Sequence, residues 1–330
     1  MSRIAILGAG AWGTALTISL ARRGGHELVL WSHSPVLAEI MTETGRNLTY
    51  LPNAMVPADV QITSDLPGAI FEADILLCVT PSQNLRSVVS EIAPLLTRNQ
   101  VILSASKGIE ERSLLRMSQV IASVTNNPIG VLSGPSFAQE VASGQPTAIV
   151  AAANDGVLAQ MIQHEFTSPS LRVYTNDDVP GVELGGALKN VIALAAGVVA
   201  GLELGSNSAA ALITRGIAEI TRLSVACGGR RQTLAGLSGV GDLVLTCTGG
   251  LSRNRLVGIE LGKGRKLEAI LADLNGKVAE GVRSTTAALG LAARYGVDMP
   301  ITEQVDAILH QGKDPKEAIR DLMTRPGRDE

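Results

Sequence analysis

Residues 3–31 have the sequence RIAILGAGAWGTALTISLARRGGHELVLW, and this stretch decides the fold of the first part of the chain. An apolar strand, a glycine-rich turn, a helix and a second apolar strand follow one another in it. Gly8 permits the tight turn, Gly10 lets the backbone approach a pyrophosphate, and Gly13 lets the helix lie close to the sheet. The pattern predicts a dinucleotide-binding βαβ unit, with the diphosphate at the helix N-terminus, where unpaired N–H groups favour an anion.

The end of the second strand indicates which nucleotide is bound. An acidic residue roughly 20 positions after the glycine turn would bind the ribose 2′-hydroxyl and repel a 2′-phosphate. This chain has Trp31, Ser32 and His33 there, and Glu27 lies at the opposite end of the strand. Ser32 and His33 can donate hydrogen bonds to a 2′-phosphate. The sequence therefore predicts that NADP(H) is used and that NAD(H) is tolerated.

Length and composition limit the other possibilities. The 330 residues exceed what one hydrophobic core usually serves, so two domains are expected. Hydrophobic residues make up 45% of the chain and aromatic residues only 2%, which suits an α/β protein packed with Ala, Leu, Ile and Val. The formal net charge of −3 gives no electrostatic basis for binding nucleic acid or an anionic membrane.

Cysteine usage and targeting signals indicate the compartment. Cys78, Cys227 and Cys247 are odd in number and widely spaced, which argues against a disulfide framework or a zinc site and for a reducing cytoplasm. The N-terminal apolar stretch carries the glycine turn, so a signal peptide is not expected. The apolar run over residues 191–202 is too short to span a bilayer. We expect a cytoplasmic protein without a metal and without membrane insertion.

The first half of the chain alternates apolar runs with amphipathic segments, as expected for a doubly wound, mostly parallel sheet. The predicted strands are 3–7, 27–31, 75–80, 101–105, 129–132, 148–151 and 172–175. Small polar loops follow three of them, at residues 80–82, 106–108 and 133–136. Since ligands of such sheets gather at the carboxyl ends of the strands, these loops are candidate parts of the site.

Helical spacing replaces the strand alternation beyond residue 180. The predicted helices are 182–202, 208–227, 253–261, 266–274, 285–295, 302–310 and 315–324. The sequence thus predicts an NAD(P)-binding Rossmann domain over residues 1–178 and an all-helical substrate-binding and catalytic domain over residues 179–330. The Ala-rich helices of the second domain can supply the face of a homodimer.

Two lysines stand out as candidates for chemistry. Lys189 lies in GVELGGALKNVIALAAG, an otherwise strongly apolar segment. It either snorkels to the surface from a helix start or is a partly buried ammonium facing a cleft between the domains. An ammonium of the second kind can deliver a proton to an alkoxide. Lys107, in SASKGIE, is either a solvated loop lysine or a second cation of this site.

Further polar candidates lie in LSGVGDLVLTCTGGLSRNR, residues 237–255. Asp242 either caps a helix or orients Lys189 or a substrate hydroxyl. Ser252, Arg253 and Asn254 follow a Gly-Gly break and begin a helix. A hydroxyl, a guanidinium and a helix N-terminus together suit a phosphate group, and the alternative is a plain serine N-cap beside a solvated arginine.

Eight motifs extend in order over nearly the whole chain: GAGAWGTAL, SKGIE, LSGPSFAQEV, ELGGALKNVIALAAG, AALITRGIAEI, GLSGVGDLVLTCT, SRNR and VAEGVRST. Together they resemble the NAD(P)-dependent glycerol-3-phosphate dehydrogenases of bacterial type. The resemblance implies an enzyme that interconverts dihydroxyacetone phosphate and sn-glycerol 3-phosphate, chiefly to supply phospholipid synthesis. It also implies a Rossmann domain followed by a helical domain of the 6-phosphogluconate-dehydrogenase type.

The resemblance also assigns roles to residues of this chain. Lys189 matches the proton donor and acceptor, and Lys107 and Asp242 match further catalytic positions. The implied substrate-binding residues are Lys107, Gly134, Ser136, Lys189, Asp242, Ser252, Arg253 and Asn254. The implied cofactor-binding residues are Gly8, Gly10, Ala11, Trp12, Gly13, His33, Tyr50, Lys107, Ala138, Arg253, Val278 and Glu280. Many relatives have serine where this chain has Ala11, which removes a hydroxyl contact to the diphosphate but keeps the backbone cradle.

Two other interpretations stay open at this point. A dehydrogenase of the same architecture that acts on a β-hydroxy acid or a 2-oxo acid would not require a phosphate-binding arginine. A redox-sensing regulator that binds NAD(P)H would require neither Lys189 nor Lys107, and it would usually carry a recognition module.

Overall fold

The computed structural model describes residues 2–274 and 278–327, and the chain forms two compact units. The first unit comprises Met1–Glu110 and Leu115–Glu183, and the second comprises Glu111–Leu114 and Leu184–Glu330. The chain therefore crosses between the units at a short loop and again inside a helix, after Glu183. The predicted domain boundary at 178/179 remains a prediction.

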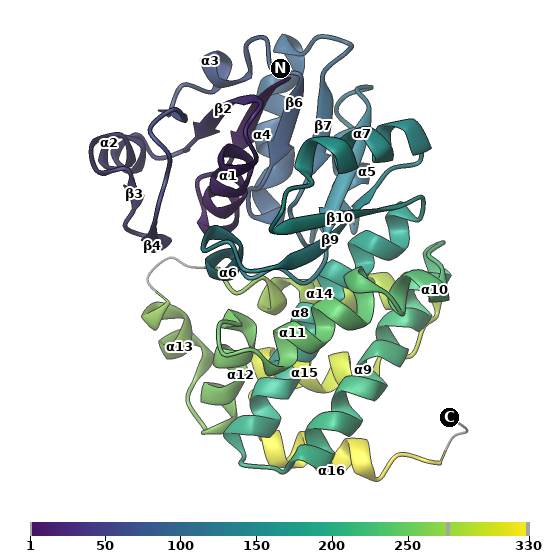
Figure 1. The fold of residues 1–330 in the computed structure, drawn as a ribbon. Helices are drawn as coiled ribbons and strands as arrows, with labels where there is room; N and C mark the ends of the chain where they lie inside the picture. Colours follow the sequence, from purple (N-terminus) through teal and green to yellow (C-terminus); the bar gives the residue numbers. More distant parts are fainter. Residues whose placement is uncertain (1, 275–277, 328–330) are drawn as a thin grey trace. The chain divides into compact units, whose positions relative to one another are not determined.

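An eight-stranded sheet forms the centre of the first unit, in the order β10-β9-β8-β7-β6-β1-β2-β5 (Figure 1). Its strands are β1 (Ser2–Leu7), β2 (His26–Trp31), β5 (Gln61–Thr63), β6 (Ile75–Cys78), β7 (Val101–Ser104), β8 (Ile129–Ser133), β9 (Thr147–Ala152) and β10 (Leu171–Asn176). Neighbouring strands are parallel except β8 and β9, which are antiparallel. The predicted mostly parallel sheet is thus confirmed.

All seven predicted strands are present, with ends that differ from the predicted ends by at most two residues. Three further strands were not predicted. β5 is an edge strand of three residues, and β3 (Arg46–Asn47) and β4 (Leu51–Met55) form a separate two-stranded sheet. Only Leu51 of β4 is buried, so this strand lacks the apolar alternation that identifies the others.

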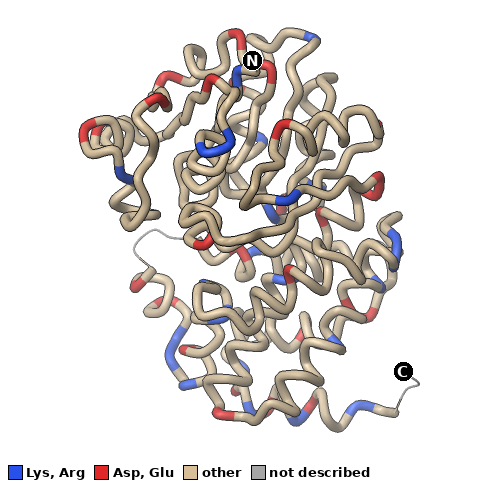
Figure 2. Tube along the Cα trace, viewed as in Figure 1, with Lys and Arg blue, Asp and Glu red and all other residues tan. Residues whose placement is uncertain are grey.

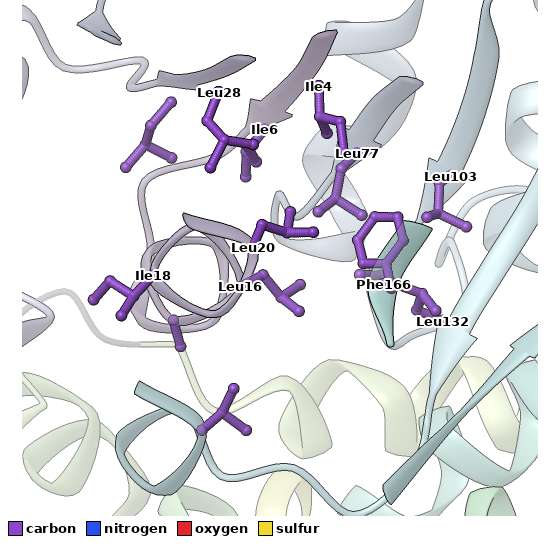
Figure 3. Packing of buried hydrophobic residues seen from close by; sticks show 14 of the residues in the cluster. Ile4, Ile6, Leu16, Ile18, Leu20, Leu28, Leu77, Leu103, Leu132 and Phe166 are labelled. Atoms are coloured by element: carbon purple, nitrogen blue, oxygen red, sulfur yellow. The ribbon is translucent and has the colours of Figure 1, made fainter. Parts of the chain in front are cut away.

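Helices cover both faces of the sheet. On one face Ile4 and Ile6 of β1 share a core cluster with Leu16 and Leu20 of α1 and Phe166 of α7 (Figure 3). On the other face the alternate residues of β1 join a cluster with α3, α4 and α5. The helices of this unit are α1 (Ala11–Arg23), α2 (Pro35–Thr44), α3 (Leu66–Ile70), α4 (Leu85–Ile92), α5 (Met117–Ala122), α6 (Ala138–Ala142) and α7 (Gly156–Phe166), with 3₁₀ turns η1 (Ser82–Asn84) and η2 (Ala93–Leu95). The double winding explains why β1 is apolar from Ile4 to Leu7, since its successive side chains point to opposite buried faces.

Helices alone build residues 184–274 and 278–327 of the second unit, as predicted. They are α8 (Val179–Gly201, which begins in the first unit), α9 (Ser206–Ala226), α10 (Arg231–Leu234), the π-helical turn η3 (Leu237–Gly241), α11 (Asp242–Thr248), α12 (Arg253–Gly262), α13 (Leu267–Asp273), α14 (Glu280–Tyr295), α15 (Pro300–His310) and α16 (Pro315–Met323). The prediction missed α10, η3 and α11, which are four to seven residues long. Figure 2 shows Lys and Arg interspersed with Asp and Glu along both units, in line with the small net charge.

The apolar helix α8 is a core helix. By length and composition it could cross a membrane, and it is the one helix among the described residues that passes this test. However, 89% of its most apolar window is buried inside the protein. The apolar run predicted over residues 191–202 is the second half of this helix, and burial against other helices accounts for its composition.

Two glycines let α8 and α12 meet backbone to backbone. A Cβ atom added to Gly197 of α8 would lie 2.1 Å from the carbonyl oxygen of Arg255, and one added to Gly258 of α12 would lie 2.0 Å from that of Leu194. Real Cβ atoms do not approach a carbonyl oxygen so closely. The crossing therefore depends on glycine at both positions, as in close-packed pairs of helices with small residues at the contact.

We expect Gly197→Ala to lower the free energy of unfolding by about 1–3 kcal/mol, because the new methyl group must push two backbones apart. Chemical denaturation followed by far-UV circular dichroism measures the change. Gly156→Ala in α7 is the matched control, because an added Cβ there meets nothing within 4 Å. Equal stability of both variants would contradict the close crossing.

Candidate active site

The glycine turn between β1 and α1 has the geometry of a phosphate cradle. Gly8 has φ +133°, and its added Cβ would lie 2.7 Å from the carbonyl oxygen of Val79. The added Cβ of Gly13 would lie 1.9 Å from the carbonyl oxygen of Gly8. Gly10, in contrast, has nothing within 4 Å of an added Cβ. The fold itself requires Gly8 and Gly13, whereas the space beside Gly10 is open at the N-terminus of α1, where an anion is favoured.

A buried asparagine that the sequence analysis missed holds this turn in place. Asn47 is fully buried, and its Nδ2 donates to the carbonyl oxygen of Ala9 and to Thr14 Oγ1, both at 2.8 Å. Its Oδ1 accepts from the backbone N–H of Tyr50 at 3.0 Å, so Tyr50, a predicted cofactor residue, is tied to the same turn. The signal in the sequence is only that of an Asx turn, which does not reveal a partner 38 residues away.

At the end of β2, one of the two residues predicted to donate hydrogen bonds to a 2′-phosphate is engaged elsewhere. Ser32 is 2% exposed, and its hydroxyl donates to the carbonyl oxygen of Ser34 at 3.1 Å and accepts from the Ser34 N–H. It is therefore engaged in the turn that starts α2, and the expected donation from Ser32 to a 2′-phosphate does not fit this conformation. His33 is exposed. Glu27 lies at the other end of the strand, as the sequence indicates. It forms an ion pair with Arg3.

Three predicted substrate-binding residues meet where β7 and β8 end. Lys107 Nζ donates to the carbonyl oxygen of Gly134 at 2.9 Å, and Ser136 Oγ donates to the same oxygen at 3.0 Å. Lys107 is half-buried, so the interpretation as a solvated loop lysine is wrong. The loops at residues 106–108 and 133–136 thus form one polar edge, as parallel neighbours at the carboxyl end of a sheet should.

The other predicted cofactor residues have varied positions. Trp12 lies in the first turn of α1, and Ala138 begins α6 and packs against the same core cluster as α1. Val278 and Glu280 stand at the start of α14 in the second unit, Val278 being 38% exposed. Ala11, the position that departs from the pattern, is the first residue of α1. Their roles remain predictions.

Lys189 lies inside the second unit and is paired. Its side chain is 9% exposed and forms an ion pair with Asp242, which is fully buried. Nζ also donates to Thr246 Oγ1 at 2.9 Å, and that hydroxyl donates to the carbonyl oxygen of Asp242 at 2.6 Å. Snorkelling is therefore excluded for Lys189. Thr246 was missed, although its spacing of four from Asp242 places both on one face of a helix.

The π-helical turn η3 places Asp242 in this pair. Asp242 is the first residue of α11, and the N-cap position belongs to Gly241. The carboxylate of Asp242 is paired with Lys189, in line with the interpretation that Asp242 orients this lysine. An added Cβ at Gly185 of α8 would lie 2.3 Å from the carbonyl oxygen of Ser238 in η3, so the two segments touch backbone to backbone just before Lys189 and Asp242.

Cys247 is part of the same environment without being a reactive thiol. It is 4% exposed, and burial raises the pKa of its thiol to about 12, against the smaller opposing effect of the Lys189 charge. Burial likewise raises the pKa of Cys78 to about 12. Both thiols stay protonated at neutral pH.

The SRNR segment begins α12 and is partly engaged in structure. Ser252 is 3% exposed, and its Oγ caps the helix by accepting from the Arg255 N–H. Asn254 Nδ2 donates to Asn190 Oδ1 at 3.0 Å, and Asn254 Oδ1 accepts from the Gly281 N–H at 3.0 Å. Arg253 is exposed at the helix N-terminus. The structure thus supports the N-cap alternative for Ser252, and it makes Asn254 a link between α8, α12 and α14.

A nucleotide cradle on a doubly wound sheet, in a chain whose helical unit buries a proton-carrying lysine, is what a two-domain NAD(P)-dependent dehydrogenase requires. Comparison with known proteins specifies the class further. Two family models match, described as NAD-dependent glycerol-3-phosphate dehydrogenase N-terminus over residues 3–159 and C-terminus over residues 178–320. The chain belongs to the NAD(P)-dependent glycerol-3-phosphate dehydrogenase family.

Individual relatives are similar to this chain over nearly its full length. The chain is 58% identical over 331 residues to the glycerol-3-phosphate dehydrogenase (NAD(P)+) of Koribacter versatilis, covering 99% of this chain and 98% of that relative. It is similar to the crystal structure of glycerol-3-phosphate dehydrogenase from Coxiella burnetii, with a TM-score of 0.94 and 40% identity, covering 98% of this chain and 99% of that one. The predicted fold class, a Rossmann-type domain followed by a helical domain, is confirmed.

We expect Gly10→Ala to weaken NADPH binding at least roughly tenfold, because the methyl group occupies the open space that a pyrophosphate needs. The free energy of unfolding should change by less than about 1 kcal/mol, since Gly10 has an extended conformation that alanine adopts. Isothermal titration calorimetry gives the dissociation constant. Gly13→Ala should instead lose stability, and unchanged NADPH affinity in Gly10→Ala would contradict the cradle.

Proposed function

We propose that this chain catalyses the reversible reduction of dihydroxyacetone phosphate to sn-glycerol 3-phosphate by NAD(P)H, and that the product supplies glycerophospholipid synthesis. The observation that carries the proposal is the buried Lys189–Asp242 pair with its hydrogen bond to Thr246. A buried lysine that is paired with a carboxylate and held in one direction by two partners suits proton transfer to a defined oxygen atom.

Residues of the helical unit divide the work on the substrate. Arg253, exposed at the N-terminus of α12, binds the substrate phosphate through charge-assisted hydrogen bonds, with the helix dipole in support. Lys189 donates a proton from its ammonium to the carbonyl oxygen as the C=O π bond breaks, and a neutral amine remains. Asp242 and Thr246 orient the ammonium. Lys107, which belongs to the first unit, is the second cation of the proposed reaction and polarises the substrate carbonyl.

Residues of the first unit hold the nucleotide. The cradle at Gly8, Gly10 and Gly13 and the N-terminus of α1 bind the diphosphate of NAD(P)H, which supplies the hydride when bound. Residues 31–33 at the end of β2 contain no carboxylate, so a 2′-phosphate meets no repulsion there. With Ser32 engaged, His33 is the remaining donor, and we propose that NADPH is used and that NADH is tolerated.

Two further features belong to this proposal. The odd number and wide spacing of Cys78, Cys227 and Cys247 support a working place in the reducing cytoplasm. The adjacent exposed residues Ala210 and Ala211 of α9 support a homodimer face on the Ala-rich helices.

The decisive experiment follows NADPH absorbance with purified protein and dihydroxyacetone phosphate, beside unphosphorylated dihydroxyacetone and beside NADH. Oxidation that requires the phosphorylated ketone supports both the reaction and the phosphate anchor. Tight NADPH binding without oxidation of any of these mixtures would overturn the proposal. The ratio of kcat/KM for NADPH and NADH tests the argument from the end of β2.

We expect Lys189→Met to lower kcat by about 10²- to 10⁴-fold, the usual contribution of a general acid, with little change in NADPH affinity. The single variant leaves the Asp242 carboxylate buried without its cation, which is destabilising. The double variant Lys189→Met with Asp242→Asn removes that charge and should stay folded but inactive. Turnover of the double variant close to that of the parent would exclude Lys189 as proton donor.

We expect Arg253→Ala to raise KM for dihydroxyacetone phosphate about 10- to 100-fold, because a hydrogen bond to a charged group is worth about 1.5–3 kcal/mol. Lys263→Ala, at the other end of α12 and paired with Glu260, is the matched control. Steady-state kinetics with saturating NADPH gives KM for dihydroxyacetone phosphate in both variants. A loss confined to NADPH affinity would assign Arg253 to the cofactor instead.

A further inference from the structure

The loop from Ile109 to Arg116, hereafter the 109–116 loop, is where the chain leaves the first unit and returns to it. Residues Glu111–Leu114 belong to the second unit, and Leu115 belongs again to the first. The loop starts two residues after Lys107. A displacement of the loop therefore also shifts the nearby backbone of Lys107, a residue that the proposed reaction needs.

The base of the loop is closed by backbone and side-chain bonds. Ile109 and Arg116 form an antiparallel bridge, and the Glu110 N–H donates to the Leu115 carbonyl oxygen at 3.0 Å. Arg86 of α4 donates two hydrogen bonds of 2.8 Å to the Glu110 carboxylate, which is 9% exposed. This bidentate pair raises the pKa of the Arg86 guanidinium, which stays charged.

The returning end of the loop is fastened to α8. Arg116 forms an ion pair with Glu183, whose carboxylate also accepts from the Ser118 N–H at 2.7 Å and from Ser118 Oγ at 2.6 Å. Glu183 is 6% exposed and lies six residues before Lys189 on the same helix. One end of the loop thus continues to Lys107, and the other is bonded to the helix that carries Lys189.

The tip of the loop holds a strained residue. Leu114 has φ +60°, a conformation that costs a bulky L residue energy and that glycine adopts freely. Its side chain packs on Gly290 of α14, where an added Cβ would lie 3.1 Å from both Cδ atoms of Leu114. Arg294 of α14 also donates to the Ser113 carbonyl oxygen at 3.3 Å. A strained backbone conformation persists where surrounding contacts hold it. Here the contact of the Leu114 side chain with α14 holds it.

Two other described residues have a positive φ without being glycine, and they make the contrast clear. Glu72 and Glu203 have φ values of 55° and 57°, and both are exposed to solvent. Of the three, Leu114 is the one whose apolar side chain packs against another element at a glycine. The strained conformation of Leu114 thus occurs together with a packing contact, whereas Glu72 and Glu203 are strained at exposed positions.

We infer that Leu114 is a positioning residue for the proposed reaction: its side chain anchors the 109–116 loop to α14, and the anchored loop fixes the backbone that carries Lys107. The inference rests on the proposed function, because Lys107 polarises the substrate carbonyl there. A misplacement of about 1 Å at a polarising group can lower the rate by as much as 10²-fold.

Three variants of Leu114 separate positioning from stability. Leu114→Ala keeps the strain and removes the anchor, Leu114→Gly removes both, and Leu114→Met keeps an apolar anchor. We expect kcat with dihydroxyacetone phosphate to fall about tenfold in both the Ala and the Gly variant and to be retained in the Met variant. The melting temperature of the Gly variant should exceed that of the Ala variant, since glycine relieves the strain. NADPH affinity should stay at the parent value, because the glycine turn is untouched.

The control is Glu203→Gly, which relieves the same kind of strain at an exposed site and should leave kcat unchanged. If activity instead followed the melting temperature across the three Leu114 variants, the role would be structural only. Parent-like kcat in both Leu114→Gly and Leu114→Ala would overturn the inference.

A second measurement keeps this test independent of the reaction. Hydrogen–deuterium exchange of the peptide over residues 107–111 should be faster in Leu114→Ala than in the parent, because the Glu110 N–H bond to Leu115 is less well held. Absence of activity in the parent would overturn the proposed function, and exchange alone would then decide whether the loop is anchored as inferred. Unchanged exchange in Leu114→Ala would overturn the coupling.

Discussion

The charge of Lys189 inside an apolar helix is the constraint on which the second unit depends. Moving an ammonium from water into a protein interior costs several kcal/mol unless a counter-ion and hydrogen bonds replace the lost hydration. Asp242 and Thr246 provide both. They can do so only because η3 and α11 approach α8 without an intervening side chain at Gly185. Gly185 is thus a geometric requirement of the buried Lys189–Asp242 pair.

The first unit satisfies a different constraint with similar means. A phosphate cradle needs exposed backbone N–H groups in a turn that is otherwise held firmly in place. Gly8 and Gly13 let the turn fit against β6 and α1, and Asn47 bonds to its backbone from the neighbouring hairpin. Gly10 alone has free space beside it. The turn is therefore fixed on the protein side and open on the side where a ligand can lie.

Sequence reasoning succeeded where the determinant is local. The strands of the sheet were found because each is a short apolar run, and the glycine turn because its spacing is fixed by backbone geometry. It failed where the determinant is the choice of hydrogen-bond partner. Nothing near Ser32 indicates that its hydroxyl is used by Ser34, and nothing near Asn254 indicates its bond to Asn190. Thr246 was the exception, since its helical spacing from Asp242 was available. The strained φ of Leu114 has no sequence signal at all.

The scarcity of aromatic residues has a practical consequence. The chain has two tryptophans, Trp12 and Trp31, and both belong to the first unit. Trp12 lies in the first turn of α1, and Trp31 ends β2, with its indole N–H donating to the Ser64 carbonyl oxygen. All intrinsic tryptophan emission therefore originates beside the nucleotide cradle. Fluorescence quenching is a built-in reporter of nucleotide occupancy in this protein, and the helical unit contributes no tryptophan of its own to the signal.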